Sequence, residues 1–114
     1  MEKIKGGVTA AKGFFAAHTA AGIKYQGRDD MALLYSEVPA EVAGTFTQNV
    51  VKAAPVKWDQ QVVKESPYAQ VVVVNAGIAN ACTGEEGMRY CKQTADQAAE
   101  VLKIPANAVL VAST

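Results

Sequence analysis

A strand–helix–strand pattern over residues 70–113 constrains the fold of this chain most strongly. Residues 70–75 contain four consecutive valines, which predicts a strand that is covered on both faces, and residues 109–113 form a second short apolar run. Two strands joined in this way are parallel members of one sheet with a right-handed crossover. The sequence therefore predicts an α/β fold with one βαβ unit, whose two strands end at the same edge of the sheet.

The segment between these strands predicts an amphipathic helix from residue 83 to about residue 103. Thr83 and Glu86 have the spacing of a capping box at the start, and Pro105 follows the end. Apolar residues recur every three or four positions, and the predicted buried stripe comprises Met88, Cys91, Ala95, Ala98 and Leu102. Because most of these side chains are small, the helix can approach a sheet closely.

The first part of the chain is interrupted more often by glycine and proline. Five glycines before residue 31 predict short strands and loops, with a hairpin around residues 19–25. Three elements are expected after this region: a buried strand over residues 31–36 that ends before Pro39, a strand over residues 42–47, and a short helix over residues 55–65.

Composition excludes several classes of protein. The 114 residues suit one small domain, and the eleven basic and eleven acidic side chains cancel, so no basic patch indicates a nucleic-acid partner or an anionic membrane. No apolar run is long enough to span a membrane, and the first residues do not resemble a signal peptide, so a cytoplasmic protein is expected. The two cysteines have no metal-binding or redox spacing, and no disulfide is expected.

Polar residues follow the first strand of the βαβ unit, where ligands tend to bind in α/β folds. Residues 75–84 offer Asn75, Asn80, Cys82, Thr83 and Gly84 ahead of a helix N-terminus, which favours negative charge. The segment lacks the glycine and lysine spacing of a phosphate-binding loop. The alternative is a capped turn, in which the two asparagines bond to the local backbone.

Other candidate groups give a weaker case for chemistry. Cys82 could be an acidified nucleophile, but the only histidine, His18, is distant in sequence, so a structural thiol is favoured. Cys91 is expected in the core. Asp29 and Asp30 have no third ligand at a suitable spacing, so no metal site is predicted.

Two hydroxyl groups, those of Ser113 and Thr114, follow the second strand of the unit. The strand has no nucleophile-elbow motif, and a plain strand boundary is the alternative. From the residues alone, the chain is an α/β fragment with an edge that favours anions and an incomplete catalytic set.

Five stretches of the chain carry a family resemblance, and they occur in one order from end to end. They are residues 6–10 with 12–14, 30–33 with Ser36, 46–47 with Asn49 and 52–56, 73–75 with 80–84, and 109–114. Together they resemble the N-terminal part of the alpha chain in the ornithine acetyltransferase (glutamate N-acetyltransferase) family of arginine biosynthesis. Ala11, Ala76 and Ile78 depart from the residues common in that family, and family members are much longer than this chain.

The resemblance implies a layered αββα sandwich, with residues 1–114 as the N-terminal portion of one larger acetyltransferase domain. Such enzymes cleave themselves, and the new N-terminal threonine of the beta chain takes acetyl from N-acetylornithine and passes it to glutamate. Bifunctional members also accept acetyl from acetyl-CoA, and no bound cofactor is implied. The implied partners are the remainder of the alpha chain and the beta chain, in an alpha2beta2 heterotetramer.

The resemblance also implies roles for residues of this chain. Thr114 matches the threonine of the oxyanion hole, whereas the following glycine and the nucleophile are not in the sequence. The residues expected to support Thr114 are Asn75, Asn80, Cys82, Thr83, Gly84 and Ser113. The chain alone is expected to be inactive. Two alternatives stay open: a non-catalytic assembly piece, and a self-processing amidase-like hydrolase of the same fold.

Overall fold

The computed structural model describes residues 2–20, 27, 29–76 and 84–114. The strands are β1 (Phe14–Thr19), β2 (Met31–Glu41), β3 (Tyr68–Asn75) and β4 (Val109–Ser113). The helices are α1 (Ala54–Glu65) and α2 (Gly84–Leu102), and two short 3-10 turns, η1 (Val8–Ala10) and η2 (Ala106–Ala108), precede β1 and β4. The predicted helices and the two predicted strands of the βαβ unit are therefore confirmed.

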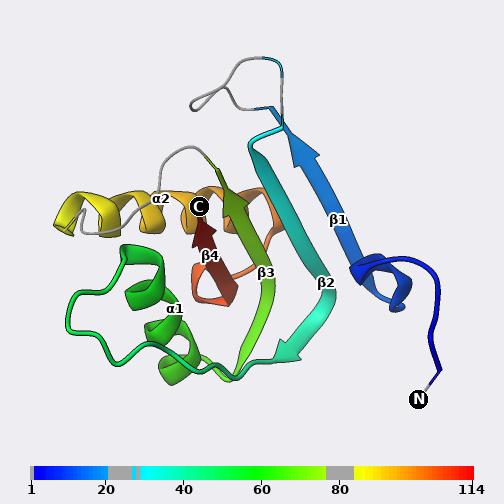
Figure 1. The fold of residues 1–114 in the computed structure, drawn as a ribbon, viewed down its shortest axis with the longest axis horizontal. Helices are drawn as coiled ribbons and strands as arrows, with labels where there is room; N and C mark the ends of the chain where they lie inside the picture. The colour runs from blue at the N-terminus through cyan, green and yellow to red at the C-terminus, as the bar shows by residue number, and fades with distance from the viewer. Residues whose placement is uncertain (1, 21–26, 28, 77–83) are drawn as a thin grey trace.

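The four strands form one sheet in the order β1-β2-β3-β4 (Figure 1). β2 is antiparallel to both of its neighbours, whereas β3 and β4 are parallel and α2 connects them. The register places Thr19, Met31, Asn75 and Ser113 in one row across the sheet. This row is the edge at which the parallel strands end, as the βαβ pattern predicts.

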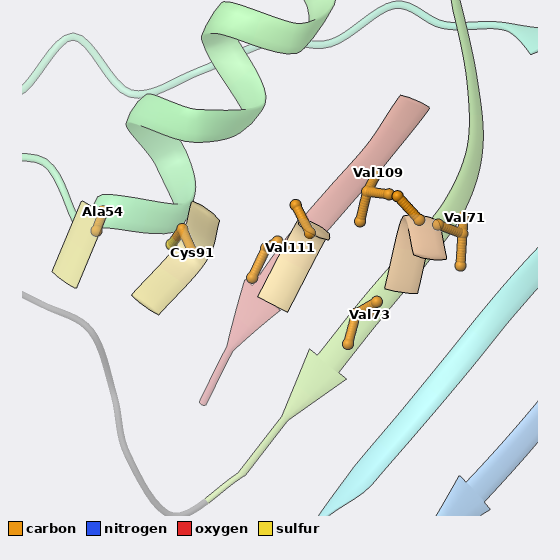
Figure 2. Close-up of a cluster of buried hydrophobic side chains, with 8 residues drawn as sticks. Ala54, Val71, Val73, Cys91, Val109 and Val111 are labelled. Atoms are coloured by element: carbon orange, nitrogen blue, oxygen red, sulfur yellow. The ribbon is translucent and has the colours of Figure 1, made fainter. Parts of the chain in front are cut away.

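The core lies on the sheet face that α2 covers. Val71 and Val73 of β3 and Val109 and Val111 of β4 point to this face, and none of them is more than 5% exposed. They form one cluster with Ala54 at the start of α1 and with Cys91, Ala95 and Ala99 of α2 (Figure 2). The expected stripe of α2 is confirmed, because Met88, Ala98 and Leu102 also pack against this cluster. The small side chains of α2 let the helix approach the valines closely.

The opposite face of the sheet carries a second apolar row. Leu34, Val72 and Leu110 lie side by side in the register of β2, β3 and β4, on the side away from the buried valines. With Phe14 of β1 they line an open apolar hollow of about 220 Å³. No helix among residues 2–20, 29–76 and 84–114 covers this row.

Two expectations for the first half of the chain are wrong. The strand from residue 31 does not end before Pro39, because β2 continues to Glu41 and pairs there with Tyr68. The register shifts between Tyr35 and Ala40, so Pro39 lies where the regular ladder is interrupted. Side chains replace part of the lost pairing: the Ser36 hydroxyl donates to the Val38 carbonyl at 2.6 Å.

Residues 42–47 form no strand, although their composition favours one. The pairing of β2 with β3 ends at Glu41, and no strand among the described residues pairs with residues 42–47. The hairpin expected around residues 19–25 falls largely on residues 21–26, which lie outside the described part of the chain. The described strands on either side, β1 and β2, pair antiparallel up to Thr19 and Met31.

Neither of the helices that the structure describes has the length and apolar character required to cross a membrane.

Candidate functional site

The ends of β3 and β4 are joined directly by a hydrogen bond. Asn75 lies opposite Ser113 in the parallel register, and the backbone N–H of Thr114 donates to the Asn75 carbonyl at 3.0 Å. In Figure 1 the C-terminus lies beside the tip of β3. Two residues that are 39 positions apart in sequence thus meet at the carboxyl edge of the sheet.

Thr114 itself is exposed at this edge. Its backbone N–H is already used by the bond to Asn75, so the group that Thr114 can offer to a ligand is its side-chain hydroxyl. Side chains alternate along a strand, and Leu110 and Ala112 belong to the open face of the sheet. The same alternation continued to Thr114 places its hydroxyl on that open face, away from α2.

Asn75 lies at the same edge of the sheet, but its side chain continues the alternation of Val71 and Val73 and so points to the opposite face from the Thr114 hydroxyl. Its side-chain Oδ1 is buried and has no hydrogen-bond partner within the described residues. A buried polar oxygen without a donor costs roughly 1–3 kcal/mol, so native proteins almost always supply one. The Asn75 amide therefore marks a point where a donor from outside the described residues fits.

The remaining predicted site residues divide into two groups. Ser113 ends β4 and is half-buried, and Gly84 begins α2 with a left-handed φ of 60°, a conformation that glycine adopts without strain. Glu85 and Glu86 in the first turn of α2 complement the helix dipole. Asn80, Cys82 and Thr83 lie outside the described residues, and so does the capping box expected from Thr83.

The pairing of β1 with β2 brings His18 to this edge, although His18 is distant in sequence from residues 75–84. His18 on β1 lies opposite Ala32 of β2, and its Nδ1 pairs with the Asp29 carboxylate. Together with Asp30 and Asn75 these residues line an open hollow of about 190 Å³. Asp30 is buried, and its carbonyl accepts a hydrogen bond from the N–H of Ala76 at 2.8 Å. Only the register of β1 with β2 could have indicated this grouping.

No group of three or more potential metal ligands occurs within the described residues.

Cys91 is confirmed as a core residue. It is 1% exposed and its thiol is free. Burial, with the nearby Asp59 carboxylate as a second cause, raises the pKa of the Cys91 thiol to about 11. The thiolate is the reactive form of cysteine, so Cys91 is chemically inert near neutral pH.

The structure also reveals a pair of side chains on α1 that the sequence pattern did not single out together. Trp58 Nε1 donates to the Val109 carbonyl at 2.8 Å, and the Val111 N–H donates to Asp59 Oδ1 at 2.9 Å. Burial raises the pKa of the Asp59 carboxyl to about 6, and the bond from Val111 opposes that rise. Helix periodicity places both residues on α1 but does not indicate contacts that span more than fifty residues.

The fold and this edge define an α/β domain that presents polar groups where parallel strands end, as enzymes of this class do. A family model described as the ArgJ family matches residues 15–114. The chain belongs to the ArgJ family. The resemblance found in the sequence is thereby confirmed.

Curated relatives match nearly the whole chain. It is 49% identical over 113 residues to the "Arginine biosynthesis bifunctional protein ArgJ" of Gloeobacter violaceus, covering 99% of this chain and 28% of that protein. It is 52% identical over 108 residues to the protein of the same name from Streptomyces coelicolor, covering 94% of this chain and 28% of the relative. The chain thus spans little more than a quarter of the length of these relatives.

Solved structures share the fold. The ornithine acetyltransferase of Mycobacterium tuberculosis, solved in complex with ornithine, superimposes with a TM-score of 0.87 at 44% identity, covering 95% of this chain and 59% of the other. The ArgJ protein of Bacillus halodurans also gives a TM-score of 0.87, at 39% identity, covering 95% of this chain and 56% of the other. The predicted α/β fold is confirmed by these similarities.

Proposed function

We propose that this chain is the N-terminal portion of a glutamate N-acetyltransferase in which Thr114 stabilises the developing oxyanion. The enzyme moves acetyl from N-acetylornithine to glutamate and serves arginine biosynthesis. The family assignment and the names of its relatives support this activity. The observation that carries the role of Thr114 is the bond from its N–H to the Asn75 carbonyl, which holds the strand tip and leaves its hydroxyl as the free donor.

The proposed reaction has two acyl-transfer steps. A threonine hydroxyl of the beta chain attacks the acetyl carbonyl of N-acetylornithine, the C–N bond breaks, and ornithine leaves as the amine with the proton. The amine of glutamate then attacks the acetyl ester, which yields N-acetylglutamate and restores the threonine. Negative charge develops on the same carbonyl oxygen in both steps, so one fixed donor serves both.

The strand tip is well suited to hold such a donor. An oxyanion donor is effective when it is in place before the reaction, because no reorganisation is then needed as charge develops. The bond to Asn75 and the parallel pairing with β3 fix the backbone of β4 up to Thr114. Asn75, Ser113 and Gly84 would support this edge, as would Asn80, Cys82 and Thr83. The unpartnered Asn75 Oδ1 would accept a hydrogen bond from an adjoining segment of the enzyme.

The uncovered sheet face supports the proposal that residues 1–114 belong to a larger domain. Leu34, Val72 and Leu110 form an apolar row that no described helix covers, and exposed apolar patches of this kind mark interaction surfaces. A second sheet from the remainder of the alpha chain or from the beta chain would complete an αββα sandwich there. The proposed assembly is an alpha2beta2 heterotetramer in the cytoplasm, with acetyl-CoA as a second acetyl donor and no bound cofactor.

The same open face supports a second candidate function, in which the chain has a non-catalytic role in assembly. In that case the row of Leu34, Val72 and Leu110 completes a sheet or subunit interface, and Thr114 has no part in the chemistry. Kinetics of the complete protein distinguish the two candidates, because an interface residue affects the amount of assembled enzyme rather than its turnover.

The experiment compares Thr114→Ala, Thr114→Val and Thr114→Ser in the complete protein, assayed with N-acetylornithine and glutamate. Removal of the hydroxyl is expected to lower kcat by roughly two to three orders of magnitude, whereas the serine variant keeps most of the rate. Thr47→Val, which removes an exposed hydroxyl outside the carboxyl edge, is the matched control and should leave kcat unchanged. Equal turnover of Thr114→Ala and the parent would refute the oxyanion role.

A further inference from the structure

The outer edge of β4 is closed by two neighbouring side chains of α1. β4 is the last strand of the described sheet, so its peptide groups on one side pair with β3 and those on the other side face α1. Trp58 Nε1 supplies a donor to the Val109 carbonyl at 2.8 Å, and Asp59 supplies an acceptor for the Val111 N–H at 2.9 Å. These are the two backbone groups that a further strand would bond.

This pair therefore acts in place of a fifth strand over the length of two residues. Unpaired groups on an edge strand normally invite pairing with another chain or let the edge twist away. The indole donates and the carboxylate accepts, so each side chain matches the polarity of the group it contacts. Both side chains lie on one turn of α1, and that helix is itself packed against β4 and α2. We call Trp58 and Asp59 the edge pair.

The edge pair acts close to the proposed oxyanion donor. Val111 is three residues before Thr114, which is about 10 Å along a strand. On the inner side, β4 is held by its pairing with β3 and by the bond from Thr114 to Asn75. The strand that leads to Thr114 is thus fixed from both edges. Loss of the outer contacts leaves it free to twist or shift against β3.

We infer that Trp58 and Asp59 are positioning residues that fix β4 from its outer edge and so hold the Thr114 hydroxyl at the reacting carbonyl. This inference rests on the proposed role of Thr114 in acyl transfer. Small errors of position are costly in such a site, because a displacement of about 1 Å can lower turnover by about a hundredfold. The edge pair touches no substrate, and its effect reaches the reaction through the strand alone.

The choice of a carboxylate as the acceptor at Asp59 also supports a positioning role. Half-burial makes the ionised Asp59 carboxylate costly, and a neutral amide would accept the same bond with less desolvation. A charged acceptor, however, forms the stronger bond to the Val111 N–H. The ionised Asp59 therefore holds the Val111 N–H at some cost in desolvation, while an amide at this position would keep the contact itself.

The test uses the complete enzyme with substitutions that separate the hydrogen bonds from packing. Asp59→Ala removes the acceptor, Asp59→Asn keeps it, and Trp58→Phe removes the indole donor while keeping an aromatic ring. We expect kcat to fall by about tenfold or more in Asp59→Ala and several-fold in Trp58→Phe with KM little changed, and Asp59→Asn to stay within about threefold of the parent. Val62→Ala on the same helix, a buried residue, is the matched control for lost packing and should leave kcat unchanged.

A double-mutant cycle shows whether the edge pair acts through Thr114. In the Thr114→Ala background, Asp59→Ala should lower kcat no further, because the positioned hydroxyl is already gone. Amide hydrogen exchange at Val111 should be faster in Asp59→Ala than in Asp59→Asn, which reports the strand contact without any assay of activity. An unchanged kcat in both Asp59→Ala and Trp58→Phe, or a full additional loss in the Thr114→Ala background, would overturn the inference.

The same experiment separates this inference from the proposed function. If Thr114→Ala lowers kcat and the edge-pair variants do not, the edge pair is structural and the oxyanion role stands. If Thr114→Ala leaves kcat unchanged, the oxyanion role fails, and the positioning inference fails with it.

Discussion

The backbone N–H of Thr114 donates to the carbonyl oxygen of Asn75 across 3.0 Å, and this bond joins the ends of two parallel strands. It commits the peptide of Thr114 to the sheet and leaves the side-chain hydroxyl for other contacts. The ends of two strands that are distant in sequence therefore form one polar edge. The proposed acyl-transfer role depends on this edge being rigid before the substrate arrives.

The half-buried carboxyl of Asp59 predicts how stability changes in mild acid. Its pKa is about 6 in the folded chain against 3.8 for an unperturbed aspartate, so the folded state binds the proton more tightly than the unfolded state. The contribution of Asp59 to stability is therefore complete below about pH 4 and is lost as the pH rises towards 6. Urea denaturation of the parent and of Asp59→Asn should show the variant gaining relative stability between pH 4 and pH 6, with no further change above pH 7. A difference that is constant over this range would contradict the raised pKa.

The core cysteine predicts a site-specific lack of reactivity. Because Cys91 is buried and the pKa of its thiol is raised to about 11, iodoacetamide should not modify it in the native protein at pH 8. The same peptide should be alkylated readily after denaturation, which serves as the control, with mass spectrometry as the measurement. Rapid modification of Cys91 in the native state would show that α2 does not cover the sheet as described.

The small buried residues of α2 predict that a larger side chain at one of these positions destabilises the fold. Ala95 is fully buried against the valines of the sheet, so Ala95→Leu should lower the free energy of unfolding by about 1–3 kcal/mol. Gln93→Leu on the exposed side of α2 is the matched control and should change stability by less than about 0.5 kcal/mol. Denaturation of both variants in the complete protein checks this, and equal stabilities would argue against close packing at Ala95.

The open sheet face predicts where a charge disrupts assembly. Leu110→Lys places an ammonium group in the apolar row of β2, β3 and β4, so it should reduce the yield of assembled complete enzyme. Val101→Lys, on a side chain of α2 that is 80% exposed, should assemble normally. Size-exclusion chromatography with light scattering measures the outcome. Normal assembly of Leu110→Lys would show that the row stays open in the complete protein.

Local patterns in the sequence were sufficient to predict the helix and strands in the second half of the chain. The four valines, the helical stripe around Cys91 and the second apolar run each specify one element, and chirality of the crossover makes the two strands parallel. The juxtaposition of Asn75 with Thr114 follows from that topology. The family resemblance supplied the role of Thr114, which two hydroxyls at a strand end could not indicate alone.

The first half of the fold depends on pairing that local patterns do not contain. β2 continues through Pro39 because the ladder with β3 is interrupted there and resumes at Ala40, which no propensity scale shows. Residues 42–47 have strand-forming composition, but none of the strands that the structure describes pairs with them. The contacts of Trp58 and Asp59 with β4, and of His18 with the carboxyl edge, arise only when the sheet is assembled.

The most direct measurement of the central claim is the carbonyl stretching frequency of the acetyl-enzyme intermediate. A hydrogen bond from Thr114 to the acyl oxygen weakens the C=O bond and lowers this frequency. Isotope-edited infrared spectra of the complete enzyme, loaded with carbon-13 acetyl from N-acetylornithine, can be compared between the parent and Thr114→Val. We predict that the band of the variant lies at higher frequency. Coincident bands in the two proteins would contradict the account.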